Sequence, residues 1–89
     1  MTPERFEEIV TDVLGWFKTA SEPARHSFKN CTEDQLIRYH HTLGRDIRND
    51  FSLWVEQWEP KIVEGVDMSE DHPDAISQRI IIEVWRRVQ

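Results

Sequence analysis

Apolar residues recur at three- and four-residue spacing near both ends of this chain, and this period constrains the fold most. Near the start, the stripe comprises Phe6, Ile9, Val10, Val13, Leu14 and Phe17. Near the end, it comprises Ile76, Ile80, Ile81, Val84, Trp85 and Val88. Each stripe is one face of an amphipathic helix, and only neighbouring elements can cover such a face. The pattern predicts an all-α fold built on helices near residues 3–19 and 73–88.

A third helix is predicted over residues 32–48. Thr32 and Gln35 have the spacing of a capping box, which marks a helix start. At the first helix, Thr2 and Pro3 similarly suit the N-cap and the first turn. The apolar stripe of the third helix would be Leu36, His40, Leu43 and Ile47.

The intervening segments carry weaker signals. Ser21 and Pro23 indicate that residues 20–30 form a connection. The period is also lost after residue 48, which predicts a kink or a break before Phe51. A short element near residues 51–64 should follow, and its apolar residues return to the core: Phe51, Trp54, Val55 and Trp58.

Within that element, Ile62 and Val63 lie between Pro60 and Gly65, so they fit either a helical turn or an extended piece tucked against the core. With 89 residues, of which 38% are apolar, the chain is long enough for one core and too short for two. We expect a compact three- to four-helix bundle that forms a single domain over residues 1–89.

Charge is concentrated between residues 56 and 74. This segment holds one lysine, Lys61, against seven acids: Glu56, Glu59, Glu64, Asp67, Glu70, Asp71 and Asp74. The other charges balance, so the segment accounts for the whole net charge of −6. An acidic patch repels nucleic acid and attracts a basic protein, whereas a solvated connecting loop explains the same composition.

Several features bear on the compartment. The single cysteine, Cys31, excludes an internal disulfide and fits a reducing environment. The first residues lack a secretory pattern, and the longest apolar run, Ile80 to Ile82, is far too short to span a membrane. We expect a cytoplasmic protein that binds no membrane.

The helix over residues 32–48 carries a second candidate site. Offsets of three and four residues bring His41, Arg45 and Arg48 onto one face, with Gly44 between them. Because glycine has no side chain, Gly44 leaves a notch on this face. The notch could admit a carboxylate or a phosphate, or it could admit another helix. The acidic residues from 64 to 74 could also fold back and pair with these arginines. His40 falls in the apolar stripe, so it should point inward and find a hydrogen-bond partner.

No pattern indicates catalysis. Adjacent histidines diverge on a helix and lack the i,i+4 spacing of two metal ligands, so no metal site is predicted. Nothing orients Cys31 as a nucleophile, and the scattered glycines form no phosphate loop. His72, with Asp74, most simply caps the last helix, although its acidic neighbours would favour its protonated form. We therefore expect no enzyme activity, no catalytic residue and no cofactor.

Three parts of the sequence carry a family resemblance. Residues 39–54 read YHHTLGRDIRNDFSLW, residues 72–75 read HPDA, and the closing helix ends in WRR. This arrangement resembles a family of small uncharacterised bacterial proteins, a domain of unknown function. That family has an aromatic-His-x-x-Leu-Gly-x-x-Ile-Arg-Asn-x-Phe-x-Leu-Trp core and a downstream His-Pro-Asp element. The resemblance covers about half of the chain and implies a shared fold without implying an activity.

Three hypotheses follow for function. The first is a protein-binding module, such as an acidic inhibitor of the immunity, antitoxin or anti-defence type, that docks a basic partner through Glu64, Asp67, Glu70, Asp71 and Asp74. An exposed tryptophan among Trp16, Trp54, Trp58 and Trp85 could serve it as an anchor. The second is a sensor of a small anion that uses His41, Gly44, Arg45 and Arg48. The third is a structural or oligomer-forming subunit, and the sequence leaves the oligomeric state open.

Overall fold

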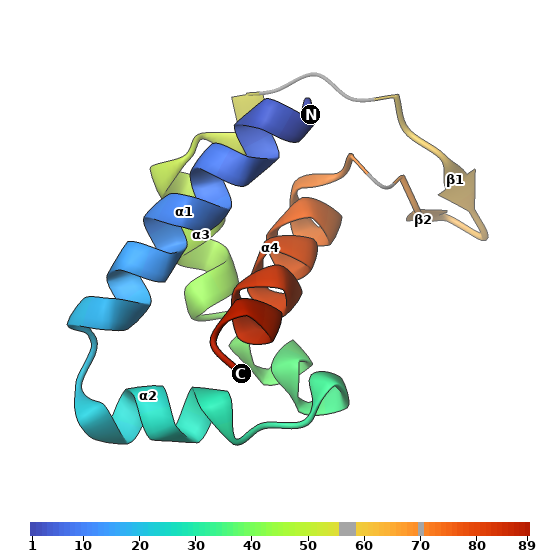
Figure 1. The fold of residues 1–89 in the computed structure, drawn as a ribbon. Helices are drawn as coiled ribbons and strands as arrows, with labels where there is room; N and C mark the ends of the chain where they lie inside the picture. Colours follow the sequence, from blue (N-terminus) through green and yellow to red (C-terminus); the bar gives the residue numbers. More distant parts are fainter. Residues whose placement is uncertain (56–58, 70) are drawn as a thin grey trace.

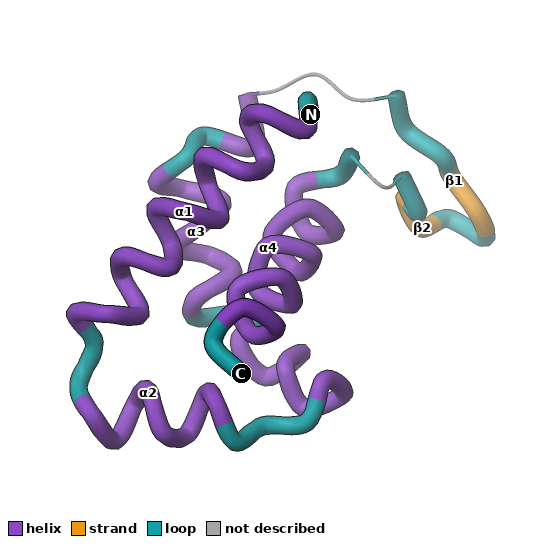
Figure 2. Tube along the Cα trace, in the orientation of Figure 1, coloured by secondary structure: helices purple, strands orange, loops and turns teal. Residues whose placement is uncertain are grey.

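The computed structural model describes residues 1–55, 59–69 and 71–89. This part of the chain is mostly helical and carries one antiparallel hairpin that stands apart from the helices (Figures 1 and 2). In chain order the elements are α1 (Pro3–Thr19), α2 (Glu22–Lys29), the 3₁₀ helix η1 (Glu33–Tyr39), α3 (Leu43–Asp50), the 3₁₀ helix η2 (Leu53–Val55), β1 (Ile62–Val63), β2 (Val66–Asp67) and α4 (Pro73–Arg87).

The first and last helices lie where the sequence predicts them. Thr2 caps α1, because its Oγ1 accepts a hydrogen bond from the Arg5 amide at 3.1 Å. His72 caps α4, because its Nδ1 accepts from the Asp74 amide at 3.1 Å. Each helix has a proline in its first turn, where a missing N–H costs nothing.

The core lies where α4 packs against α1, α3 and η1. Its most deeply buried apolar side chains come from all four elements: Ile9, Val10, Val13, Leu36, Ile47, Ile76, Ile80, Ile81 and Val84. The apolar stripes of the two terminal helices thus cover each other, and burial of their side chains supplies most of the stabilisation.

The prediction that residues 20–30 form a connection is wrong, because residues 22–29 form α2. The two residues that suggested a turn start this helix instead. Ser21 is its N-cap and accepts from the Ala24 amide, and Pro23 lies in the first turn. Phe28 is the one buried side chain of α2, so the helix lacks the apolar stripe that sequence analysis requires.

The predicted helix over residues 32–48 is divided in the structure. The segment starts as expected, with the Thr32 amide donating to Gln35 Oε1 at 2.9 Å, but it forms η1 and ends at Tyr39. After a turn, α3 begins at Leu43. In a continuous helix the His40 carbonyl would accept from the amide of residue 44; here it accepts from the Arg48 side chain.

The break before Phe51 is confirmed, since α3 ends at Asp50 and Ser52 has a positive φ of 53°. The expected return to the core is only partly found. Phe51 packs against the core and Leu53 is buried, but Trp54 is 49% and Val55 is 78% exposed. Trp58 lies outside the described residues.

The hairpin corrects the all-α prediction. Ile62 pairs with Asp67 and Val63 pairs with Val66, and the turn between them uses positive φ at Glu64 and Gly65. Positive φ at both turn residues matches the right-handed twist of the strands. The extended alternative for Ile62 and Val63 is therefore correct, but both side chains are exposed and neither packs on the core.

Candidate functional site

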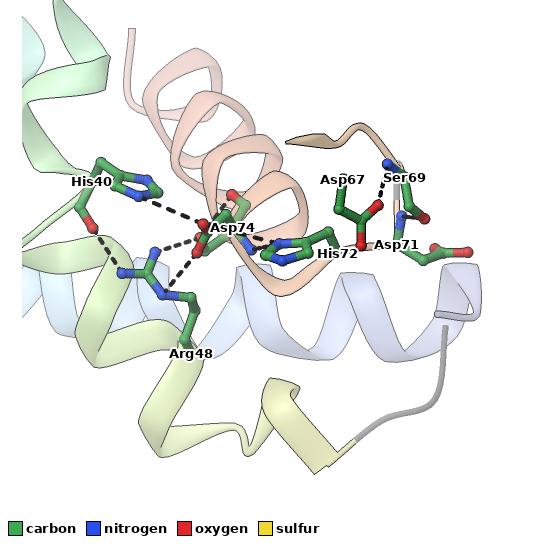
Figure 3. A network of polar contacts seen from close by, with 8 residues as sticks. His40, Arg48, Asp67, Ser69, Asp71, His72 and Asp74 are labelled. Atoms are coloured by element: carbon green, nitrogen blue, oxygen red, sulfur yellow. Dashed lines mark hydrogen bonds and ion pairs between the residues drawn. The ribbon is translucent and has the colours of Figure 1, made fainter. Parts of the chain in front are cut away.

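Arg48 of α3 forms the centre of a polar network at the start of α4 (Figure 3). Its Nε lies 3.5 Å from Asp74 Oδ1, its Nη1 donates to Ser77 Oγ at 3.0 Å, and its Nη2 donates to the His40 carbonyl at 3.1 Å. Arg48 is only 6% exposed, so these contacts compensate for the loss of water around a buried cation. The network ties α3, α4 and the turn after η1 together.

Two imidazoles flank the Asp74 carboxylate, whose side chain remains 46% exposed. His40 Nε2 lies 4.0 Å and His72 Nδ1 lies 3.9 Å from Asp74 Oδ2. The expected cap by His72 is confirmed, and His40 points toward Asp74 as Figure 3 shows. Ser77 is fully buried and donates to the Asp74 carbonyl, so its hydroxyl is committed to the network and is not placed as a nucleophile.

The predicted anion-binding face is not assembled. His41 and Arg45 are exposed, whereas Arg48 turns inward to Asp74. No notch remains at Gly44, because a Cβ there would lie 2.9 Å from Arg48 Nη1 and 3.7 Å from an Ile81 methyl group. Close packing therefore accounts for this glycine.

The acidic segment does fold back, but through few residues. Asp74 pairs with Arg48, and the Asp71 carboxylate lies 3.4 Å from the amino terminus of Met1. Asp67 Oδ1 accepts from the amides of Lys61 and Ser69, which fixes the base of the hairpin. Three of the five predicted partner-binding acids thus make internal contacts.

Two further acids of the acidic segment are exposed. Glu64 is exposed in the turn of the hairpin, and Glu59 is exposed at the start of the same segment. Glu56 and Glu70 lie outside the described residues. Within the described residues, Glu59 and Glu64 are therefore the exposed acids of this segment whose side chains make no internal hydrogen bond or ion pair.

The hairpin exposes apolar side chains among these acids. Ile62, Val63, Val66 and Met68 are 47–63% exposed, and Ile37 of η1 is 60% exposed. Together these five residues are called the hairpin surface. A groove of about 430 Å³ runs between the hairpin and the helices, with Ile37, Val66 and Met68 among its lining residues.

The floor of this groove is polar. Asp74 and Gln78, one turn apart on α4, line it together with His40 and His72. Gln78 Oε1 is buried and has no hydrogen-bond partner among the described residues. A buried acceptor without a partner favours the binding of a molecule that brings a hydrogen-bond donor into the groove.

Three titrating groups elsewhere have shifted pKa values. Arg87 of α4 donates to both carboxylate oxygens of Glu7 at 2.7 Å, and these hydrogen bonds lower the pKa of Glu7 below its ordinary 4.5. The same contacts raise the pKa of Arg87, so the pair is charged over a wide pH range and joins α1 to α4. Burial raises the pKa of Tyr39 above 10, which keeps its phenol neutral.

Within the described ranges, no three histidine, cysteine, aspartate or glutamate side chains are placed to hold a metal ion. No described helix has the length and apolar content needed to cross a membrane.

Residues 14–88 match the family model described as a domain of unknown function, DUF6794. The chain belongs to this family. No curated protein and no solved structure gives a significant match. Within this DUF6794 domain, the segments 39–54 and 72–75 supply all the side chains of the network around Arg48 except Ser77.

Sequence reasoning missed the exposed apolar residues of this DUF6794 domain. A signal was present, because residues 62–67 read IVEGVD, with glycine in the second turn position between β-branched residues. That pattern indicates a hairpin. The exposure of the hairpin, however, arises because none of the described helices covers it, and no local pattern encodes this.

Proposed function

We propose that this domain is a protein-binding module that docks a basic partner on the hairpin surface and in the groove beside it. The observation that carries the proposal is the exposure of five apolar side chains within and opposite the most acidic segment of the chain. None of the apolar residues of the hairpin belongs to the core, so their partial burial contributes little to folding.

The apolar residues suit a contact that excludes water. Val63 and Val66 are opposite each other across the strands, and Val66 and Met68 follow each other at two-residue spacing. Cross-strand partners and alternate residues share one face of a hairpin. Their face lies toward Ile37 across the groove, which gives an incoming side chain apolar walls on two sides.

Charge favours a basic partner and disfavours self-association. Glu59 and Glu64 are exposed beside the hairpin, and the segment as a whole is strongly acidic. Two copies facing each other through this surface would oppose like charges, whereas a basic protein would be attracted and steered onto it. An inhibitor that covers a basic functional surface, as immunity proteins and antitoxins do, fits this chemistry.

The small-anion hypothesis has less support, because Arg48 is buried and Gly44 offers no notch. His41 and Arg45 alone are ordinary exposed side chains. The oligomer-forming hypothesis predicts a molar mass that rises with concentration, and light scattering coupled to size-exclusion chromatography would measure it.

The test compares variants that change the hairpin surface without touching internal contacts. Val66→Thr/Met68→Gln removes apolar area while keeping a β-branched residue in β2. Glu59→Gln/Glu64→Gln neutralises two exposed acids, and the matched control Asp12→Asn/Asp50→Asn removes the same charge from α1 and α3. Asp67 and Asp71 are avoided, since loss of Asp67 would disturb the hairpin and loss of Asp71 would remove its contact with the amino terminus.

The wild type is used to capture partners from the native host, and each captured protein is then purified and titrated by calorimetry. We expect affinity to fall about tenfold or more for Val66→Thr/Met68→Gln. Glu59→Gln/Glu64→Gln should weaken binding mainly at low salt, because exposed charges are screened. A partner that binds both variants as tightly as the control would contradict the proposed surface.

A further inference from the structure

A second cleft, away from the hairpin, opens between α1, α2 and α3. Its volume is about 310 Å³. Four aromatic side chains line it: Trp16, Phe17, Phe28 and Tyr39. All except Phe28 remain partly exposed, so the rings present unburied apolar surface to the cleft.

Ring contacts hold these walls in place. Trp16 stacks on Phe51 with centroids 5.5 Å apart. Phe28 packs edge-on to Tyr39 at 5.2 Å and tilted against Phe17 at 5.8 Å. Aromatic pairs at these distances are favourable beyond their buried area, so the walls are fixed before any ligand arrives.

Arg25 links α2, which forms the remaining wall of the cleft, to the end of α1. Its Nη1 donates to the carbonyls of Lys18 and Ala20, which end α1. Together with the ring contacts of Phe28, this fixes α2 at its middle and near its C-terminal end. The cleft is therefore a space between anchored helices, and the atoms around it forgo the dispersion contacts that closer packing would give.

Two opposite charges line the same cleft. Arg25 is half-buried, and within the described part of the chain its Nε and Nη2 make no hydrogen bond. Asp46 of α3 is exposed and also lines the cleft. A guanidinium edge with two open donors is suited to a carboxylate.

The volume limits the size of an occupant. A dry apolar cavity of about 150 Å³ accommodates benzene. This cleft has about twice that volume, which corresponds to two fused rings with a short substituent. We propose that it binds a small aromatic carboxylate of about the size of indole-3-acetate, with the ring between the aromatic walls and the carboxylate on Arg25. This site is independent of the hairpin surface.

The experiment titrates isotopically labelled protein with three probes and follows the indole N–H of Trp16 and the amides of α2 by NMR. The probes are indole, indole-3-acetate and its neutral isostere indole-3-acetamide. We expect saturable shifts at these signals, with indole-3-acetate bound about three- to fivefold more tightly than the amide, as one partly exposed charge pair allows. Trp54, which lies elsewhere, should not respond.

Variants locate the two parts of the site. Arg25→Gln should abolish the preference for the carboxylate and leave indole binding intact, whereas Arg45→Gln, which removes an exposed arginine outside the cleft, should change neither. Ala24→Leu adds bulk at an exposed lining position and should weaken all three probes. If Arg25→Gln displaces α2, Arg25→Lys serves instead, since it keeps the cation and should retain part of the preference.

Two results would overturn the proposal. One is the absence of saturable shifts at Trp16 and α2 up to the solubility limit of the probes. The other is equal affinity of the wild type for indole-3-acetate and indole-3-acetamide, because the carboxylate would then make no contact with Arg25.

Discussion

The helical core and the hairpin differ in how far they bury apolar side chains and in how their charged side chains are paired. In the core, Ile9, Ile47 and Ile80 are fully buried and Arg48 is paired on every side. In the hairpin, Ile62 and Val66 are more than half exposed, and the Asp67 carboxylate binds backbone amides of its own segment. Folding free energy therefore comes mainly from the core, and the exposed hairpin contributes little to it.

The comparison also explains the two roles of acidic residues within one segment. Asp74 lies on α4 and stabilises the core through Arg48, while Glu64 lies at the tip of the hairpin and contacts solvent. Although these carboxylates are close in sequence, they do not lie on one surface. Substitutions can therefore separate the stability of the core from the proposed binding.

The largest loss of stability is expected from Ile80→Ala. Ile80 of α4 is fully buried in the core. Truncation removes its transfer free energy and leaves a cavity, so the free energy of unfolding should fall by roughly 2–5 kcal/mol. Urea denaturation followed by circular dichroism measures this. A loss no larger than that of Ile62→Ala in the hairpin would break the comparison.

A smaller loss is expected from Arg48→Met. Methionine fills much of the space but leaves the His40 carbonyl and Ser77 Oγ without their donor, which costs about 1–3 kcal/mol. The Asp74 carboxylate is half-exposed and can be solvated, so losing its ion pair adds only modestly to the loss of stability. A double-mutant cycle with Asp74→Asn measures the coupling, and zero coupling would show that the ion pair is not energetically significant.

Gly44→Ala tests the close contact at the position where the sequence allowed either a bound anion or another helix. The new methyl group would displace Arg48 Nη1, and this cost outweighs the gain in helix propensity, for a net loss of about 1 kcal/mol. In the Arg48→Met background the clash is relieved. The same substitution should then be neutral or stabilising in urea denaturation, and a loss that persists there would assign the cost to the Tyr39 carbonyl instead.

Acid pH should weaken the link between α1 and α4. Because Arg87 lowers the pKa of Glu7 in the folded state, the pair contributes stability above the unfolded pKa of 4.5 and loses it as pH falls through the folded pKa. Wild type and Glu7→Gln should therefore differ by a constant small amount near neutral pH and converge in acid. Thermal unfolding as a function of pH measures the difference, and a gap that widens in acid would contradict this sign.

The sequence predicted the elements whose burial is periodic and missed those fixed by distant contacts. The stripes of α1 and α4 determine those helices locally, and their caps locate both starts. In contrast, α2 buries only Phe28, and η1 separates from α3 where Arg48 takes the His40 carbonyl. Arg48 reaches Asp74 across 26 positions of sequence, so no helical spacing could place it in the core.

The smallest effect on stability, and the sharpest test of the comparison, is expected in the hairpin. Val66→Thr/Met68→Gln changes two side chains that are 57% and 59% exposed, so the free energy of unfolding should change by no more than about 0.5 kcal/mol. Hydrogen exchange at the Met68 amide, which donates to the Lys61 carbonyl, reports whether the hairpin persists. An intact hairpin and an unchanged core together with weaker partner binding would assign these residues to recognition. A loss of stability comparable to that of Arg48→Met would instead make the hairpin part of the folding unit, and its apolar exposure would then need a structural explanation.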